Sequence, residues 1–332
     1  MQQKIAEIAH MQAFDATISL FDATQRAVDI VNTSAHPTNK VAATLIGQRR
    51  NGTAYCTSRT NYWPPEIEQH FGREIKIGNA SGTVHAETAC ILHSPYTYGA
   101  SLCVTDPFCP NCAKNMAEAG ICAIYIDHKG FKKDFARRRG HHFRAMSMEL
   151  CAKAGIAIYE LNRKQKQITP ILEIDPGYTA PQDNPPAFQT RDKLSLNDFI
   201  ANQHIVHGAA KFACAQGDDD GKPLYVGTGF HPVIGFTSTN ADDLYTIANP
   251  PGKYSFIQEP VNRLLMAAAR HGLILDKNSL YCSQVPTARE LVNCVGAGIT
   301  HLAAGDSGQA RDDNALEALN QLESAGIISL HR

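Results

Sequence analysis

The 332-residue sequence lacks a charge imbalance, a long apolar run and the features of an N-terminal signal peptide. Its 31 basic and 32 acidic residues give a formal net charge of −1, which argues against a chain that wraps nucleic acid or lies on a membrane surface. No window approaches about eighteen apolar residues without a charge, so we expect no membrane span. The N-terminal stretch carries charges at Lys4, Glu7 and Asp15 and has no small-residue cleavage site. These absences predict a cytoplasmic protein.

Disulfide bonds are not expected either. Many of the ten cysteines lie in apolar runs such as TACIL, SLCVT and GICAIYI, which is typical of buried thiols in a reducing compartment. Cys109 and Cys112 differ, because they flank a Pro-Asn pair in DPFCPNCAKN. In a reducing compartment a C-x-x-C pair is more often metal-binding or catalytic than a structural disulfide. Taken alone, the pair leaves open a redox dithiol, a structural zinc site and a catalytic metal site.

Helix and strand patterns alternate along the chain and predict an α/β fold with a largely parallel sheet in each of two halves. A stretch with five of the seventeen prolines, residues 163–195, is predicted to link residues 1–162 to residues 196–332, although its Ile-Leu-Glu-Ile segment leaves a short strand possible. The predicted helices are 12–33, 83–94, 109–120, 143–155, 196–213, 256–272, 287–298 and 314–326. The predicted strands are 40–47, 53–58, 100–106, 121–127, 156–161, 223–228, 232–238, 279–284, 299–305 and 327–332.

The two halves resemble each other in sequence. Residues 101–121 (SLCVTDPFCPNCAKNMAEAGI) overlay without gaps on residues 279–299 (SLYCSQVPTARELVNCVGAGI), with Ser-Leu at the start and Ala-Gly-Ile at the end of both. This match favours a domain duplication, and chance similarity between strand–helix–strand units is the alternative.

A second cluster upstream gives the C-x-x-C pair its context. His85 and Glu87 lie at the start of a predicted helix, so that H-x-E precedes C-x-x-C as in zinc deaminases. His85, Cys109 and Cys112 supply the three ligands of a catalytic zinc, which keeps a fourth position open for water. Glu87 is predicted to carry protons from zinc-bound water to a base and its leaving amine. A helix that begins near Pro110 would favour both thiolates.

The first half resembles the cytidine/deoxycytidylate deaminase superfamily from about residue 12 to residue 160. The motifs that carry this resemblance are HAE (85–87), DPFCPNCAKNMAEAGI (106–121) and PTNKVAATLIG (37–47). The resemblance implies a three-layer α/β/α cytidine-deaminase-like fold, one zinc ion in the first half, and hydrolytic deamination of a nucleobase.

The resemblance also implies where a substrate would bind. The family commonly uses an asparagine after the second strand to contact its ligand, and Asn61 matches that position by order, with an ordinary turn asparagine as the alternative. Trp63, next to Tyr62, either stacks on a base or packs on the rim of the pocket. Phe108 stands where the family usually has proline and is expected to reshape this rim. Ala86, between the two motif residues of HAE, completes the expected substrate contacts.

The best expectation for the substrate is a cytosine nucleoside or nucleotide of the cytidine, CMP or dCMP type. The basic stretch 129–144 has seven Lys or Arg residues against one Asp, and either binds a phosphate or is a solvated loop. Two alternatives remain. One is a tRNA-type RNA deaminase that uses this stretch, and the other is a zinc-containing nucleotide-binding or interaction protein without turnover.

The second half is predicted to have lost the zinc site. The overlay places Thr287 under Cys109 and Glu290 under Cys112, and a shift of six residues places Ile257 under His85 and Glu259 under Glu87. We therefore expect one zinc ion per chain and a degenerate deaminase-like second half with a structural or regulatory role. Some cytidine deaminases that resemble this plan pair a catalytic core with a broken one and dimerise, so a homodimer with two zinc ions is the expectation.

Overall fold

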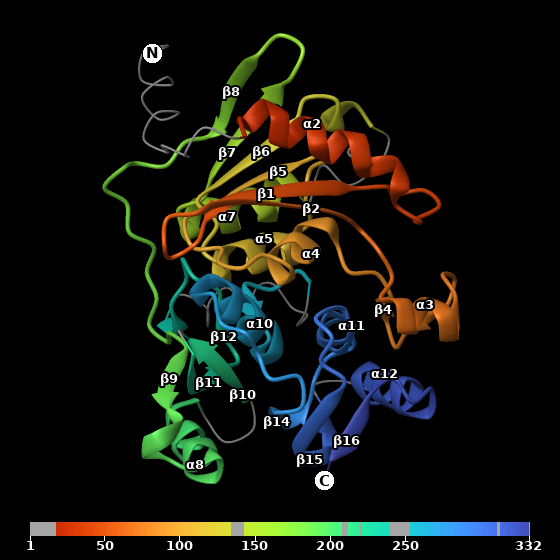
Figure 1. Cartoon of the computed structure of the whole chain (residues 1–332), viewed down its shortest axis with the longest axis vertical. Coiled ribbons are helices and arrows are strands. Elements are labelled where there is room, and N and C mark those ends of the chain that lie inside the picture. The colour runs from red at the N-terminus through yellow and green to blue at the C-terminus, as the bar shows by residue number, and fades with distance from the viewer. Residues whose placement is uncertain are drawn as a thin grey trace.

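Two six-stranded sheets lie toward opposite ends of the molecule in the computed structural model (Figure 1). The structure describes residues 18–133, 143–207, 212–219, 221–239, 253–310 and 313–331. The first sheet has the order β2-β1-β5-β6-β7-β8. Its strands are β1 (Ala42–Gln48), β2 (Ala54–Thr60), β5 (Ser101–Val104), β6 (Ala123–Asp127), β7 (Ala157–Asn162) and β8 (Gln167–Leu172).

The first sheet is mixed, so the predicted, largely parallel sheet is wrong. Strands β5, β6 and β7 run parallel, whereas β1 is antiparallel to both β2 and β5, and β8 is antiparallel to β7. Short hairpins explain two of these antiparallel pairs, β1 with β2 and β7 with β8, because a short hairpin can join only antiparallel strands. Gly52, with a φ of 82°, forms the tight turn between β1 and β2.

Helices cover both faces of the first sheet. On one face lies α2, whose small residues Ala23 and Ala27 are buried, and on the other lie α4, α5 and α7 (Figure 1). The predicted helix 12–33 is described only from residue 18, and its first part lies outside the described residues. The helices of this half are α2 (Leu20–Ile30), α3 (Pro65–Phe71), α4 (Ala86–Leu92), α5 (Pro110–Glu118) and α7 (Met148–Ala154), with 3₁₀ turns η1 (Val31–Thr33) and η2 (Gly130–Lys132) and a π-helical turn η3 (Phe143–Ser147).

The second sheet repeats this plan. Its order is β16-β15-β14-β10-β11-β9. Read from the other end, the five strands β11, β10, β14, β15 and β16 have the same pairing directions as β2, β1, β5, β6 and β7 of the first sheet. The helices α5 and α11 also begin and end at positions that the gap-free overlay pairs. The strands are β9 (Ala187–Thr190), β10 (Phe212–Asp219), β11 (Lys222–Gly229), β14 (Leu280–Val285), β15 (His301–Ala310) and β16 (Ser329–His331).

The remaining elements include the helices of the second half and several short strands. The helices are α8 (Leu196–His207), α10 (Pro260–His271), α11 (Ala288–Gly296) and α12 (Asp313–Ser324), with a 3₁₀ turn η4 (Arg191–Lys193). Two-stranded pairs are formed by β3 (Lys76–Ile77) with β4 (Ala80–Ser81), and by β12 (His231–Pro232) with β13 (Ile257–Gln258).

Two sequence predictions of the second half need correction. The predicted helix 196–213 ends at His207, and Phe212 and Ala213 belong to β10, where successive side chains face opposite sides of the sheet. Only Pro232 of the predicted strand 232–238 is in a strand. The predicted linker 163–195, in which the sequence left a short strand possible, contributes β8 to the first sheet and β9 to the second.

The two halves share one hydrophobic core. Helices α4, α5 and α10 pack against one another between the two sheets, and α11 and α12 continue this central layer (Figure 1). Buried polar side chains also cross between the halves. Lys114 on α5, 2% exposed, donates to the carbonyl of Ile257 over 2.8 Å, and the fully buried Arg263 on α10 lies 3.5 Å from Glu118. None of the helices within the described residues is long and apolar enough to cross a membrane.

Candidate metal centre and pocket

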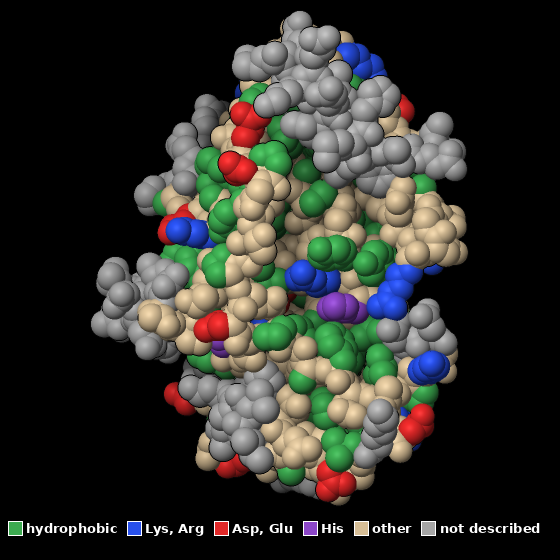
Figure 2. All heavy atoms as spheres, turned by 90° about the vertical axis from the view of Figure 1, so that its left-hand side faces the viewer, with side chains coloured by type: hydrophobic (Ala, Val, Ile, Leu, Met, Phe, Trp, Pro, Cys, Tyr) green, Lys and Arg blue, Asp and Glu red, His purple; other side chains and the backbone are tan. Residues whose placement is uncertain are grey.

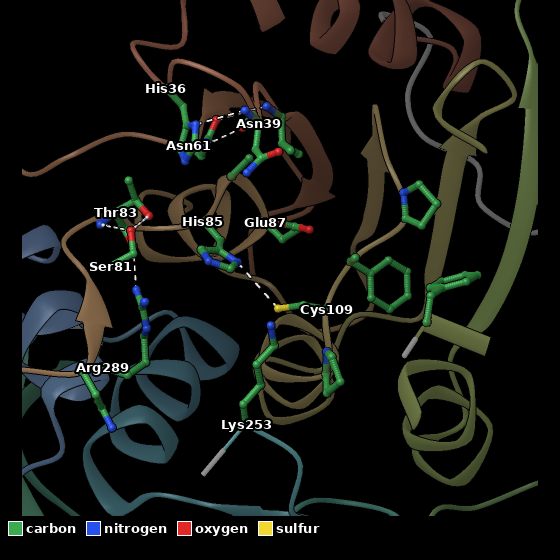
Figure 3. A pocket seen from close by; sticks show the side chains of 17 residues that line it. His36, Asn39, Asn61, Ser81, Thr83, His85, Glu87, Cys109, Lys253 and Arg289 are labelled. Atoms are coloured by element: carbon green, nitrogen blue, oxygen red, sulfur yellow. Dashed lines mark hydrogen bonds between the residues drawn. The ribbon is translucent and has the colours of Figure 1, made fainter. Parts of the chain in front are cut away.

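Three potential metal ligands meet where two helices of the first half begin. His85 is the N-cap residue of α4, Cys109 is the N-cap residue of α5, and Cys112 lies in the first turn of α5. The segment before His85 is held by backbone hydrogen bonds between Val84 and Tyr62 of 2.8 and 3.1 Å. The Nδ1 atom of His85 lies 3.6 Å from the sulfur of Cys109 (Figure 3) and 3.2 Å from that of Cys112, and the two sulfurs lie 3.6 Å apart.

These distances fit a tetrahedral zinc ion. With Zn–S bonds of about 2.3 Å and a Zn–N bond of about 2.0 Å, tetrahedral geometry places two sulfurs about 3.8 Å apart and sulfur and nitrogen about 3.6 Å apart. The observed separations are close to these values, and one imidazole with two thiolates is a ligand set that zinc accepts. The three residues can therefore hold one metal ion and leave its fourth position for another ligand.

The surroundings favour at least one thiolate. The pKa of Cys109 lies well below the ordinary value of a thiol, because hydrogen bonding from Cys112 stabilises its thiolate and His85 adds positive charge. The same pairing, together with burial, raises the pKa of Cys112 well above its ordinary value. Both cysteines lie at the N-terminus of α5, where the helix dipole favours a thiolate.

Glu87 lies beside the metal ligands and is not one of them. It is in the first turn of α4, is 4% exposed, and lines the same pocket as His85 and Cys109. Burial raises the pKa of its carboxyl group above the ordinary value. In Figure 3 its side chain lies on the opposite side of His85 from Ser81. A carboxyl group in this position can accept and return a proton within reach of the metal's open position.

A pocket of about 380 Å³ opens onto these residues, which is a size typical of small-molecule sites. One wall is aromatic, since Phe108 and Phe143 meet edge to face with ring centroids 5.2 Å apart. The pocket is lined by His36, Asn39, Val41, Asn61, Asn79, Ser81, Thr83, His85, Ala86, Glu87, Pro107, Phe108, Cys109, Pro110, Phe143, Lys253 and Arg289.

The expected substrate contacts lie at different places. Ala86 and Phe108 line the pocket, and so does Asn61. The side-chain amide of Asn61 makes its hydrogen bonds within the protein. Its Oδ1 accepts from Ser34 Oγ and the Val41 N–H, and its Nδ2 donates to the carbonyl of Asn39. Trp63 does not line the pocket and packs behind it against His36, with ring centroids 5.4 Å apart.

Tyr62, the neighbour of Trp63, also points away from the pocket. Its hydroxyl donates to the carbonyl of Gly296 in the second half over 3.1 Å. The aromatic wall is instead formed by Phe108 with Phe143, and the sequence signal for Phe143 was only its place at the start of a predicted helix.

Sequence reasoning missed seven polar residues of the pocket, which are His36, Asn39, Asn79, Ser81, Thr83, Lys253 and Arg289. Asn39 lies in the PTNKVAATLIG motif and His36 directly precedes it, so both could have been found from that motif. Lys253 and Arg289 come from the second half, and no local pattern indicates that they reach the first-half site. In Figure 3 Lys253 extends toward Cys109.

The matching place in the second half has different side chains. By helix position, the N-cap residues Glu259 of α10 and Thr287 of α11 correspond to His85 and Cys109, and Glu290 corresponds to Cys112. Glu259 thus matches His85, and the expected match to Glu87 is wrong, because the six-residue shift ignored where α10 begins. Glu290 lies at the position that corresponds to the ligand Cys112, and it forms a capping box with Thr287. Its carboxylate accepts from the N–H groups of Thr287 and Val261, both over 2.8 Å.

The basic stretch 129–144 is described only at its ends, and residues 134–142 lie outside the described residues. Lys133, near its start, pairs with Asp106 over 2.7 Å. On the face shown in Figure 2, the described basic and acidic side chains are scattered in small groups among apolar and neutral ones.

Comparison with known proteins gave a limited result. The chain matches no protein-family model and no curated protein sequence. Among solved structures it is similar to the dCMP deaminase of the cyanophage S-TIM5, in its apo form and in complex with dCMP and dUMP. The two structures are each 18% identical to it, cover 43% and 42% of this chain and 96% and 93% of theirs, and give TM-scores of 0.30 and 0.29. At these TM-scores the likeness defines neither the fold nor the activity of this chain.

Proposed function

We propose that the chain is a zinc-dependent hydrolytic deaminase whose substrate is a cytosine nucleoside or nucleotide. The observation that carries this proposal is the meeting of His85, Cys109 and Cys112 at metal-ligand distances, with the buried Glu87 in the same pocket. A structural zinc site would use four closed ligands and would have no need of a pocket or of a buried carboxyl group beside the metal.

The reaction replaces the exocyclic amine of the base by oxygen. Zinc, when bound to the three ligands, would make a water molecule more acidic and hold it beside the base. Glu87 takes a proton from this water and passes protons to the ring nitrogen and the amine. The water oxygen becomes the ring carbonyl, the exocyclic C–N bond breaks, and ammonia leaves.

The pocket walls support a base with an attached sugar. Phe108 and Phe143 offer an aromatic surface for the ring of a base. Asn39 Oδ1, a buried atom without a hydrogen-bond partner among the described residues, can accept from a sugar hydroxyl or a ring amine. Asn61 acts by holding the Asn39 backbone, and Ala86 lines the pocket between His85 and Glu87.

The second half belongs to the same proposal as a duplicated, zinc-free copy. The five strands with equal order and pairing directions support a duplication, with residues 1–162 and 196–332 as the two domains and 163–195 as their connection. A homodimer is proposed with them, and analytical ultracentrifugation would test it. A chain that sediments as a monomer at micromolar concentration would contradict the dimer.

The activity is tested by a screen for ammonia release over bases, nucleosides and nucleotides, with Glu87→Ala as the blank. We expect release from at least one cytosine nucleoside or nucleotide, and none from that compound with the variant. If every compound gives the rate of the blank while the protein holds zinc, the small-molecule deaminase is contradicted, and a binding protein or an RNA deaminase replaces it.

A further inference from the structure

The wall of the candidate site is completed by the second half of the chain. Arg289, in the first turn of α11, lines the same pocket as His85, Glu87 and Cys109. It also lines a smaller adjoining cavity of about 70 Å³ with His85, Cys109 and Cys112. Arg289, a residue of the second half, thus lies beside the candidate metal ligands of the first half.

Arg289 holds the segment that leads to His85. Its Nη1 atom donates to the carbonyl of Thr83, two residues before His85, over 2.6 Å (Figure 3). The same short segment is tied locally by a hydrogen bond of 2.7 Å between the hydroxyl groups of Ser81 and Thr83. Since His85 is the N-cap residue of α4, its imidazole position depends on where this segment enters the helix.

The charge of Arg289 also suits its surroundings. Burial lowers the pKa of its guanidinium group, and the thiolates of Cys109 and Cys112 act in the opposite direction. Lys253, the other cation of the pocket wall, extends toward Cys109 (Figure 3). Together the two cations place positive charge beside the thiolate of Cys109.

We propose that Arg289 is a positioning residue for the metal centre, which fixes the Thr83–His85 segment so that His85 meets Cys109 and Cys112 at ligand distances. The inference depends on the zinc-binding part of the proposed function and is independent of which base is deaminated. It gives the second half a direct task, because the metal centre of one half is then incomplete without the other.

The expected effect is a loss of metal affinity. Zinc brings two positive charges and displaces at most two thiol protons, so removal of a nearby cation would not by charge alone weaken its binding. A loss of affinity in a variant of Arg289 therefore reports the position of His85. Outer partners of metal ligands typically contribute about 10–100-fold in affinity, and we expect Arg289→Met to weaken zinc binding by this factor. Arg289→Lys keeps a donor for the Thr83 carbonyl and should restore most of the affinity.

Arg50 provides a matched control. Its Nη2 atom donates to the carbonyl of His271 over 2.6 Å, so it too joins the two halves by one guanidinium–carbonyl hydrogen bond. Arg50 is exposed and does not line the pocket. Arg50→Met therefore removes a cation and a cross-half hydrogen bond of the same length, and should leave zinc affinity unchanged.

The experiment is a zinc titration of the full-length variants against a chromophoric chelator, with thermal unfolding of the same samples. Weaker binding by Arg289→Met, rescue by Arg289→Lys and wild-type binding by Arg50→Met support the inference. Wild-type zinc affinity in Arg289→Met overturns it, and so does an equal loss in Arg50→Met. If Arg289→Met does not fold, Arg289→Gln, which is too short to reach Thr83, takes its place with the same expected loss.

Failure of the proposed function would look different. A wild-type protein that binds no zinc contradicts the proposed function itself. A wild-type protein that binds zinc tightly, with unchanged affinity in Arg289→Met, contradicts only the positioning task.

Discussion

In each half the N-termini of two helices lie close together, those of α4 and α5 in the first half and those of α10 and α11 in the second. The two halves stabilise these pairs of N-termini in different ways. In the second half, Glu290 caps its own helix through Thr287 and accepts from Val261 at the start of α10, so one carboxylate joins both helices. In the first half, neither His85 nor Cys109 makes a side-chain capping hydrogen bond, and three ligand atoms meet instead. The same helix geometry is thus stabilised by a carboxylate in one half and is suited to a metal ion in the other.

Removal of a ligand should have the largest effect and would break this comparison most directly. In Cys112→Ala we expect the zinc content to fall from about one ion per chain to near zero, because two protein ligands do not retain the ion. Elemental analysis of purified protein measures this content. Glu290→Gln, at the matching position of the other half, should keep its zinc, and a variant that lost zinc equally would contradict the assignment of the site.

Replacement of the buried carboxyl group should separate chemistry from metal binding. Glu87→Gln keeps the shape of the side chain but cannot take a proton, so turnover should fall by about 10²–10⁴-fold with zinc retained. Ammonia release and zinc content, measured on the same samples, test this. Glu259→Gln, in the second half, should retain activity, and an equal loss there would show that the halves do not differ as described.

Loss of Glu290 should destabilise the fold more than it affects the metal site. This carboxylate is 2% exposed and accepts four hydrogen bonds from Thr287, Val261 and Asn262. Glu290→Ala leaves buried N–H groups without an acceptor, so we expect the free energy of unfolding to fall by about 3 kcal/mol. Urea denaturation measures it, and a loss below about 1 kcal/mol would mean that Glu290 does not join the two helices.

A smaller effect is expected where the halves meet. Lys114→Met removes the hydrogen bond from Lys114 to the carbonyl of Ile257 and leaves that carbonyl buried, at a cost of about 1–3 kcal/mol. Because the halves share one core, thermal unfolding should remain a single transition at a lower temperature. The exposed Lys222→Met is the control and should change little. Two separate transitions in the wild-type protein would contradict a shared core.

Much of the fold follows from local pattern, because most helices and strands overlap the predicted ranges. The helix predicted for 196–213 ran too far because Phe212, Ala213, Cys214 and Ala215 are all apolar, and only their alternation between the two faces of the sheet marks β10. The pairing directions were missed because they depend on the hairpins, such as the turn at Gly52, and not on the strand pattern itself.

The metal ligands could be predicted because their spacing is a local signature, whereas the pocket wall could not. Arg289 and Lys253 reach the site only because α11 and the segment before α10 pack against the first half, and this contact has no trace in nearby sequence. Trp63 shows the opposite error, because its place beside Asn61 predicted a substrate contact while the fold turns its ring toward His36.

The central claim is that one half of the chain carries the metal and the other half does not. Native mass spectrometry of the full chain, with and without a chelator, counts bound zinc ions directly. We predict one zinc ion per chain, absent in Cys109→Ala and retained in Thr287→Ala, its counterpart in the second half. Two zinc ions per chain, or a single ion that survives in Cys109→Ala, would contradict the claim.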